Sequence, residues 1–592
     1  MSFHPHDVRR RAIAATILVI LPLALLGAAF FRTQVIEHEQ FALQSETNRL
    51  RPIPLPAPRG IIYDRHGRVI AESVPGYSVS MIAKDADSLR ATLEVLAESI
   101  ALTDQQIEAT LRRYRAMPSR PALIFGDAEF DLVSVLEELR PDFPGLVVQA
   151  APKRFYPDAE AVSAFVGYTG EIDERELARP EFEGYTAGEQ VGKDGLERWY
   201  EEDLRGREGT RFVEVDARNR IVRERGARTE LPPETAPPLY TNIDLDLQRH
   251  VVRIMGDSMQ GGVLAMDPVT GGVLALHSAP GFDPNRFIGG ISAQYYDSLN
   301  TDPRTPMYNK VLKGRYPPAS TYKLATASLG LQLGLVDLNT RMAVPCNGGI
   351  SIGGRYWRCW RREGHGNVDL RGAIAGSCNV YFYQLGRQIG LRRMLAGGVD
   401  LHMHERSGID LPGENRGTMP ASVEYYNERY GPRGWTETGV VMNLAIGQGE
   451  NTQTVTNMAR FYAALATDGR APIPSVVRQV SPEREQLLDL SPEQLEDLRT
   501  AMLDVVSSRG TAGSAQLRGI RIGGKTGTAQ NPQGLDHAWF VGFAPIEDPK
   551  LVIAVMIEFG QSGSVAARVA SSVFERYLRA PTAPIPVTED ID

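Results

Sequence analysis

The stretch Ser320-Thr-Tyr-Lys323 places a serine and a lysine three residues apart. Two further strings follow it in order, Ser377-Cys-Asn379 and Lys525-Thr-Gly-Thr528. Together the strings contain a hydroxyl nucleophile, an amine, a second hydroxyl with an amide, and a cation flanked by hydroxyls. This set of groups is complete for acyl transfer through a serine ester. The sequence therefore predicts that the three segments meet at one site.

A helix is predicted from Ser320 to about Gln332. Positions i and i+3 share one face of a helix, so Lys323 should lie beside Ser320. A neutral amine there can take the proton of the serine hydroxyl, and a protonated one can stabilise the alkoxide. The free N–H groups of the helix N-terminus suit an oxyanion. Ser320 and Lys323 are the predicted nucleophile and base.

The second and third strings are predicted to handle the substrate. Ser377 and Asn379 should lie on a loop, where the hydroxyl relays a proton to the leaving amine and the amide holds a peptide group of the substrate. The segment 523–528 should be a strand whose glycines permit close approach. Its Lys525 suits a substrate carboxylate. The substrate-binding residues expected beside it are Thr526, Gly527 and Thr528.

Lysine usage supports a chemical role for two of these residues. Only eight of the 64 basic residues are lysine, and Lys323 and Lys525 are among the eight. Elsewhere the chain uses arginine for most of its cations. A buried lysine can lose its proton near neutral pH, whereas arginine cannot. A serine and lysine at this spacing are common by chance, so the prediction depends on the ordered occurrence of all three strings.

Length and charge restrict the possible classes of protein. With 592 residues the chain is too long for one hydrophobic core, so two or more domains are expected. The formal net charge of -8 argues against a nucleic-acid partner, which would need a basic face.

Residues 12–31 contain no charged side chain and would span about 30 Å as a helix, enough to cross a bilayer. Three arginines, residues 9–11, precede this segment, which favours a cytoplasmic N-terminus and an exported remainder. A cleaved signal peptide is the alternative, because Gly27-Ala-Ala29 resembles a cleavage site. We favour a retained anchor, since signal peptides usually have apolar cores of only about 7–15 residues.

Proline clusters and strand patterns outline the domains. Four prolines between 227 and 238 mark a boundary. Residues 86–140 look helical, 261–276 predict a hairpin, and 538–544 and 551–559 predict strands. Strands at both ends of the second domain indicate one antiparallel sheet covered by helices, an α+β fold. The expected divisions are a cytoplasmic tail (1–11), an anchor (12–31), a non-catalytic domain (32–235), a catalytic domain (236–579) and a disordered tail (580–592).

The order and spacing of the three strings resemble those of the penicillin-binding proteins and serine β-lactamases. The upstream units Arg59-Gly…Asp64-Arg-His-Gly67 and Gly195-Leu-Glu197…Tyr200-Glu201 resemble the elongated, dimerisation-type pedestal of class B penicillin-binding proteins. The single predicted membrane anchor is also similar to that of class B penicillin-binding proteins. The resemblance implies a peptidoglycan D,D-transpeptidase that is inhibited by β-lactams and needs no cofactor for catalysis.

The resemblance also implies a role for each residue of the strings. Ser320 would be acylated by a D-Ala-D-Ala stem peptide with Lys323 as the base, while Ser377 and Asn379 form the second motif. Lys525, Thr526 and Thr528 would bind the substrate carboxylate. The backbone N–H groups of Ser320 and Thr528 would form the oxyanion hole.

Within class B, the stretch Lys153-Arg-Phe-Tyr-Pro157 and a Trp-rich insertion before Ser377 suggest an elongation-type member, with the division-specific type second. The implied partners are a membrane glycan polymerase of the SEDS family and other elongation proteins. The resemblance also implies that this protein is anchored in the inner membrane and that its catalytic domain is periplasmic. A carboxypeptidase or β-lactamase would share the nucleophile, but the chain has no clear deacylating glutamate. A penicillin sensor or scaffold is disfavoured by the short cytoplasmic tail and the intact strings.

The chain contains only three cysteines, Cys346, Cys359 and Cys378, and His365 falls between the last two. With the histidine they make the four ligands of a closed tetrahedral zinc site. Some elongation-type relatives resemble this, with a metal site in the loop before the second string. A Cys346–Cys359 disulfide with Cys378 buried is the main alternative, and three free thiols are the other. We expect structural zinc, which would hold Ser377 and Asn379 in place.

Overall fold

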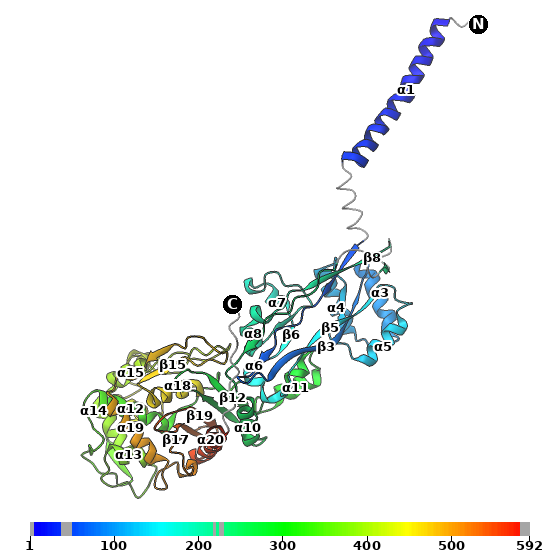
Figure 1. Ribbon diagram of the computed structural model, residues 1–592. Coiled ribbons are helices and arrows are strands. Elements are labelled where there is room, and N and C mark those ends of the chain that lie inside the picture. Colours follow the sequence, from blue (N-terminus) through cyan, green and yellow to red (C-terminus); the bar gives the residue numbers. More distant parts are fainter. Residues whose placement is uncertain (1–4, 37–49, 217–220, 224–229, 581–592) are drawn as a thin grey trace.

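The computed structural model describes residues 5–36, 50–216, 221–223 and 230–580 (Figure 1). Its first helix, α1 (Pro5–Phe31), projects from the rest of the molecule as an isolated rod. The segment Arg9–Val35 is long and apolar enough to cross a membrane, and none of it is buried. The predicted apolar span, residues 12–31, lies inside this segment.

The domain that follows is built on the long strand β3 (Val69–Met81). Strand β5 (Leu146–Phe155) pairs with it antiparallel over most of its length. Two shorter strands also pair with β3, β2 (Ile62–Tyr63) near its start and β4 (Ala122–Phe125) near its end. A separate antiparallel sheet lies near the end of α1 in Figure 1. Its strands are β1 (Leu50–Leu55), β8 (Gly209–Val215) and β9 (Ile221–Arg223).

The sequence pattern suggested that residues 86–140 are helical throughout, but the region is not continuously helical. Strand β4 interrupts it between helices, because the alternating run 122–125 completes the edge of the β3 sheet. The expected apolar face is present, since Leu89, Leu93 and Leu96 are buried. The helices of this region are α3 (Ala86–Ala97), α4 (Asp104–Ala116) and α5 (Phe130–Leu139).

A buried ionic cluster joins the two upstream units of the sequence. The Arg59 guanidinium lies 2.9 Å from carboxylates of both Glu197 and Glu201. Arg154 from β5 lies 2.6 Å from Glu197, and Tyr156 donates a hydrogen bond to the same carboxylate. Each buried charge is paired, which is the condition under which burial of charge is tolerated. The cluster fixes the segment after Arg59 against the short helix α8 (Gly195–Trp199).

The second domain contains a five-stranded antiparallel sheet in the order β12-β11-β19-β18-β17. The hairpin expected at 261–276 supplies β11 and β12, and β11 pairs with β19 from near the end of the chain. The expected assembly of one sheet from distant segments is thus confirmed. The strands are β11 (Gly261–Met266), β12 (Val273–Ala279), β17 (Gly523–Ala529), β18 (His537–Ala544) and β19 (Leu551–Ile557).

Helices cover both faces of this sheet. α20 (Gly563–Leu578) packs on β17, β18 and β19 and contacts α10 (Leu245–Met255). α18 (Val455–Ala466) contacts β11, β18 and β19 and is buried along its whole length. A second lobe of helices lies at the far end of the molecule from α1 (Figure 1). It includes α12 (Lys323–Gln332), α13 (Leu370–Ala375), α14 (Asn379–Ile389), α15 (Leu391–Asp400), α17 (Glu437–Leu444) and α19 (Pro492–Val505).

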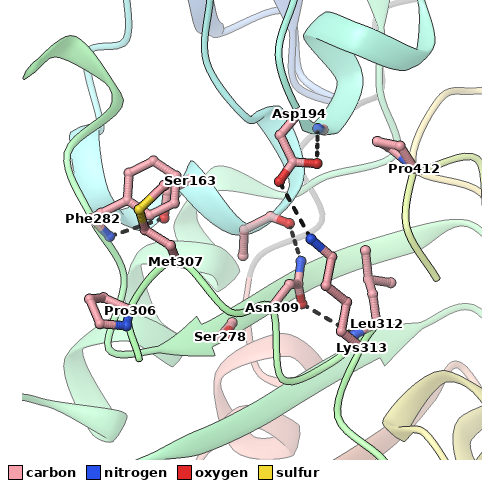
Figure 2. Close-up of a pocket in the computed structure, with 12 residues that line it drawn as sticks. Ser163, Asp194, Ser278, Phe282, Pro306, Met307, Asn309, Leu312, Lys313 and Pro412 are labelled. Carbon is pink, nitrogen blue, oxygen red and sulfur yellow. Dashed lines mark hydrogen bonds and ion pairs between the residues drawn. The ribbon is translucent and has the colours of Figure 1, made fainter. Parts of the chain in front are cut away.

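The two domains share a packed junction. Strand β10 (Leu239–Tyr240), just beyond the expected boundary at 235, pairs in parallel with β2. Figure 2 shows a cavity at the junction, where Lys313 faces Asp194 across 3.9 Å and Asn309 donates to the carbonyl of Ala164. The expected tail 580–592 lies outside the described residues except for its first residue, and so does 1–4 of the expected cytoplasmic tail.

Candidate active site

Ser320 lies on a 3₁₀ turn, Ala319–Tyr322, that leads directly into α12. The helix therefore begins three residues later than the sequence pattern indicated. Ala319 has a φ of 49°, and its N–H donates to the carbonyl of Gly447 at 2.8 Å. A Cβ at position 447 would lie 2.3 Å from the Ala319 carbonyl oxygen, so only glycine fits beside this turn. The turn leaves Ser320 half-buried at the surface of the domain.

Lys323 is fully buried and connects the first string to the second. Its Nζ lies 2.8 Å from the Ser377 carbonyl oxygen, 3.2 Å from Ser377 Oγ and 2.6 Å from Asn379 Oδ1. The amine also lies 5.5 Å above the ring of Phe382. No hydrogen bond joins Ser320 Oγ to another side chain in the described part of the protein. The nearest partners of the amine are thus the residues of the second string.

Ser377 and Asn379 are held by the ends of two helices. Ser377 follows α13 with a φ of 54°, the left-handed region that non-glycine residues seldom adopt. Its N–H donates to Ile374, and the N–H of Cys378 donates to Ala373. Asn379 is the first residue of α14 rather than a loop residue. Both polar side chains consequently face the Lys323 amine.

Strand β17 brings the third string to the turn that carries Ser320. A Cβ at Gly527 would lie 3.0 Å from the carbonyl oxygen of Pro318, which explains the need for glycine at this crossing. Lys525 is fully buried, and its amine donates to the Thr526 carbonyl. The Thr528 side chain is exposed at the strand edge, near the N-terminus of α20. All three strings therefore converge, as the sequence predicted.

The two buried amines are kept from being charged together. Burial lowers the pKa of Lys323 to about 8, although the neighbouring cysteines oppose the shift. Burial and the charge of Lys323 lower the pKa of Lys525 further below its usual range. An amine with a pKa near 8 is available in its neutral form at physiological pH, so Lys323 is suited to accept a proton.

Thr511 is a residue of the site that the sequence did not indicate. Its hydroxyl lies 2.8 Å from the hydroxyl of Thr526, so it orients a side chain that is expected to bind the substrate carboxylate. Thr511 lies outside the three strings, and no periodicity or spacing around it indicates the contact. Only the fold brings it to β17.

The cysteines and the histidine expected to bind metal also come together. One ligand atom from each of Cys346, Cys359, His365 and Cys378 lies within 4.8 Å of all the others. The His365 Nδ1 atom is 3.6 Å from Cys346 Sγ and 3.5 Å from Cys359 Sγ. A tetrahedral zinc site has ligand–ligand separations of about 3.5 to 3.8 Å, given its bond lengths. The three cysteines are free thiols in this arrangement, and all are buried.

Comparison with known proteins now gives the family. A model described as "Penicillin binding protein transpeptidase domain" matches residues 261–575, and one described as "Penicillin-binding Protein dimerisation domain" matches 54–235. The first match alone spans more than half of the chain. The chain belongs to the penicillin-binding proteins. The expected α+β fold with a pedestal domain is thereby confirmed.

Individual relatives support a narrower class. "Peptidoglycan D,D-transpeptidase MrdA" of Acinetobacter baumannii is 32% identical, with 96% of this chain and 88% of the relative covered. The structure of PBP2 of Helicobacter pylori in complex with MreC has a TM-score of 0.78 at 27% identity, over 89% of this chain and 99% of that chain. A chain solved in a study of "polymerization and crosslinking by a peptidoglycan synthase complex" has a TM-score of 0.69 at 30% identity, over 97% and 99%. The expected peptidoglycan D,D-transpeptidase class is confirmed.

Proposed function

We propose that Ser320 of this penicillin-binding protein is acylated by the penultimate D-Ala of a peptidoglycan stem peptide and that Lys323 is the base. A neutral amine has two N–H bonds and one lone pair. The Ser377 carbonyl and Asn379 Oδ1, at 2.8 and 2.6 Å, accept the two N–H bonds. The lone pair is then free for a hydroxyl proton. This arrangement around Lys323 is the observation that carries the proposal.

The remaining groups are assigned by their positions. The Ser320 oxygen attacks the substrate carbonyl, and its proton passes to Lys323. The backbone N–H groups of Ser320 and Thr528 stabilise the oxyanion. The Ser377 hydroxyl, 3.2 Å from the amine, relays the proton to the leaving D-Ala. Lys525, Thr526 and Thr528 bind the substrate carboxylate, and the amine of a neighbouring stem then takes the acyl group from Ser320.

Peptide products distinguish this reaction from its alternatives. The full-length protein in detergent is supplied with a synthetic stem pentapeptide ending in D-Ala-D-Ala and an amine-bearing acceptor stem, and the products are weighed by mass spectrometry. Cross-linked peptide supports a transpeptidase. Free D-Ala without cross-links would indicate a carboxypeptidase. Rapid hydrolysis of added penicillin would indicate a β-lactamase, and no reaction at all would favour a scaffold or sensor.

We also propose that Cys346, Cys359, His365 and Cys378 bind one structural zinc ion. The donor set fits, since three sulfurs and an imidazole nitrogen are close enough for a tetrahedron after small movements. The neighbouring Cys378 thiol and His365 lower the pKa of Cys359. Bound zinc would supply a cross-link rather than chemistry. It would tie the insertion 346–365 to Cys378, between the two polar residues that hold Lys323.

The cellular setting is likewise a proposal. We infer that α1 is a retained anchor in the inner membrane, that the N-terminus is cytoplasmic and that both folded domains are periplasmic. We propose that the protein acts in cell elongation, with a SEDS-family polymerase and with an MreC-type protein of the kind bound by the Helicobacter pylori relative. The proposed domain limits are 32–235 for the pedestal and 236–579 for the catalytic domain. Round cells on depletion would support the elongation role, and filaments would contradict it.

A further inference from the structure

Trp360 contacts the second string through its indole nitrogen. Its Nε1–H donates to the carbonyl oxygens of Gly376 at 3.1 Å and Ser377 at 3.0 Å. The side chain is 57% exposed, so this contact is made by the edge of a ring that is otherwise largely open to solvent. Trp360 lies just beyond β14 (Arg355–Arg358), in the insertion that carries the cysteines.

The Ser377 carbonyl oxygen is the same atom that accepts from Lys323 at 2.8 Å. A carbonyl oxygen has two lone pairs, so it can accept from the indole and from the amine together. The peptide that it belongs to is not held by regular secondary structure, because Ser377 has a φ of 54° at the break between α13 and α14. The Cys378 N–H of the same peptide donates to Ala373, so the indole N–H is a second contact that fixes the direction of this carbonyl.

The insertion is seated directly on this peptide. A Cβ at Gly376 would lie 3.0 Å from the His365 ring, and His365 makes an edge contact with Trp360 at 5.5 Å between ring centroids. Asn379 Nδ2 also reaches the carbonyl of Arg358, at 3.5 Å. A shift of the insertion would thus move both the Ser377 carbonyl and the Asn379 side chain, which accept hydrogen bonds from the Lys323 amine.

We propose that Trp360 is a positioning residue for Lys323. The indole N–H fixes the Ser377 carbonyl, and the carbonyl in turn directs one N–H of the amine, so that the amine's lone pair faces Ser320. This inference rests on the proposed acylation of Ser320 and adds a residue to it. Without the indole N–H, the Ser377 carbonyl has one contact fewer, and the direction of the Lys323 lone pair is less well fixed. The acylation of Ser320 becomes slower, while the preceding binding of the substrate is unaffected.

The test separates the N–H bond from the ring. Position 360 is changed to phenylalanine (Trp360→Phe) and, in a second protein, to 3-benzothienylalanine, which keeps the two-ring shape but has sulfur in place of N–H. Stopped-flow acylation of the full-length protein by a fluorescent penicillin gives the affinity of the first complex and the rate constant of acylation separately. We expect the acylation rate constant to fall about tenfold in both, as for the loss of one hydrogen bond. We expect the affinity, the thermal midpoint and the metal content to stay the same.

Trp199→Phe is the matched control, because Trp199 is 52% exposed and lies in the pedestal on α8. It should leave both constants unchanged. An unchanged acylation rate constant in the benzothienyl protein would overturn the inference, and so would a parallel loss of affinity and thermal stability, which would indicate packing alone. Failure of the wild-type protein to be acylated would overturn the proposed function itself, and this inference with it.

Discussion

Lys323 Nζ lies 2.6 Å from Asn379 Oδ1, although 56 positions separate the two residues in the sequence. Lys323 is the first residue of α12, and Asn379 is the first residue of α14. The fold thus places the proposed base, Lys323, where two helices begin, and the adjacent strand β17 adds the third string.

Replacing Lys323 with arginine should abolish acylation. Arginine keeps the positive charge but cannot release its proton in a protein, so the general base is lost. We expect the rate of penicillin acylation to fall by about a thousandfold, within the range contributed by general bases. Lys550→Arg, at an exposed lysine paired with Asp548, is the control and should have no effect. Near-normal acylation of Lys323→Arg would refute the role of a titratable amine.

The acylation rate should rise with pH through about 8. Burial lowers the pKa of Lys323 to about 8, so the amine is mostly protonated below this pH and mostly neutral above it. Only the neutral form can accept the Ser320 proton, which gives the direction of the change. The measurement is the second-order acylation rate constant between pH 6 and about 9.5. A rate that falls over this interval would mean that the protonated amine is the active form.

Thr511→Val should weaken substrate binding more than it slows chemistry. The Thr511 hydroxyl pairs with that of Thr526 at 2.8 Å, and a lost hydrogen bond of this kind costs about 1 kcal/mol. We expect KM for a stem pentapeptide to rise roughly fivefold with kcat nearly constant. Thr511→Ser keeps the hydroxyl and should restore KM. An unchanged KM in Thr511→Val would mean that the hydroxyl does not contribute to substrate binding.

Glu197→Gln should destabilise the pedestal. Glu197 is fully buried and faces both Arg59 and Arg154, so the amide would leave Arg154 without its carboxylate partner and Arg59 with Glu201 alone. Loss of one member of a buried ion pair costs about 3 to 5 kcal/mol in the free energy of unfolding. Calorimetry of the full-length protein measures the change. Glu202→Gln, at the exposed neighbouring glutamate, should leave the unfolding transition where it is.

Purified protein should contain one equivalent of zinc, measured by elemental analysis with thiol titration. Cys359→Ser removes one of the four ligands and should lower the zinc content well below one equivalent. It should also slow acylation, because Cys378 lies between Ser377 and Asn379. Loss of the zinc by chelation should have the same effect on acylation. A zinc-free protein with one free thiol and an intact disulfide would contradict this prediction.

The sequence predicts the chemistry of this protein better than its geometry. Ser320, Lys323 and Lys525 could be found because each has a side chain that the reaction needs, in a string with characteristic spacing. The hairpin and C-terminal strands could be found because apolar runs between turn residues have few alternatives. The start of α12 at Lys323 could not, since the turn before it is held by distant backbone at Gly447. The left-handed Ser377 could not either, because it lies where α13 ends, and no residue pattern marks that end.

The same reasoning explains why strand β4 of the pedestal and the contact made by Thr511 were not predicted. The run 122–125 is too short to be distinguished from helix by its pattern, and only pairing with β3 makes it a strand. The contact of Thr511 with Thr526 joins two residues whose neighbours carry no signal. The cysteines and His365 could be grouped from the sequence, because the three cysteines of the chain lie in one segment and His365 falls between two of them.

The central claim is that Ser320 forms the acyl-enzyme with Lys323 as its base. The most direct measurement is peptide mass spectrometry of the full-length protein after reaction with penicillin. A stable adduct on the peptide that contains Ser320, absent in Ser320→Ala and nearly absent in Lys323→Arg, is the predicted result. An adduct on any other residue, or one that forms equally well in Lys323→Arg, would contradict the account.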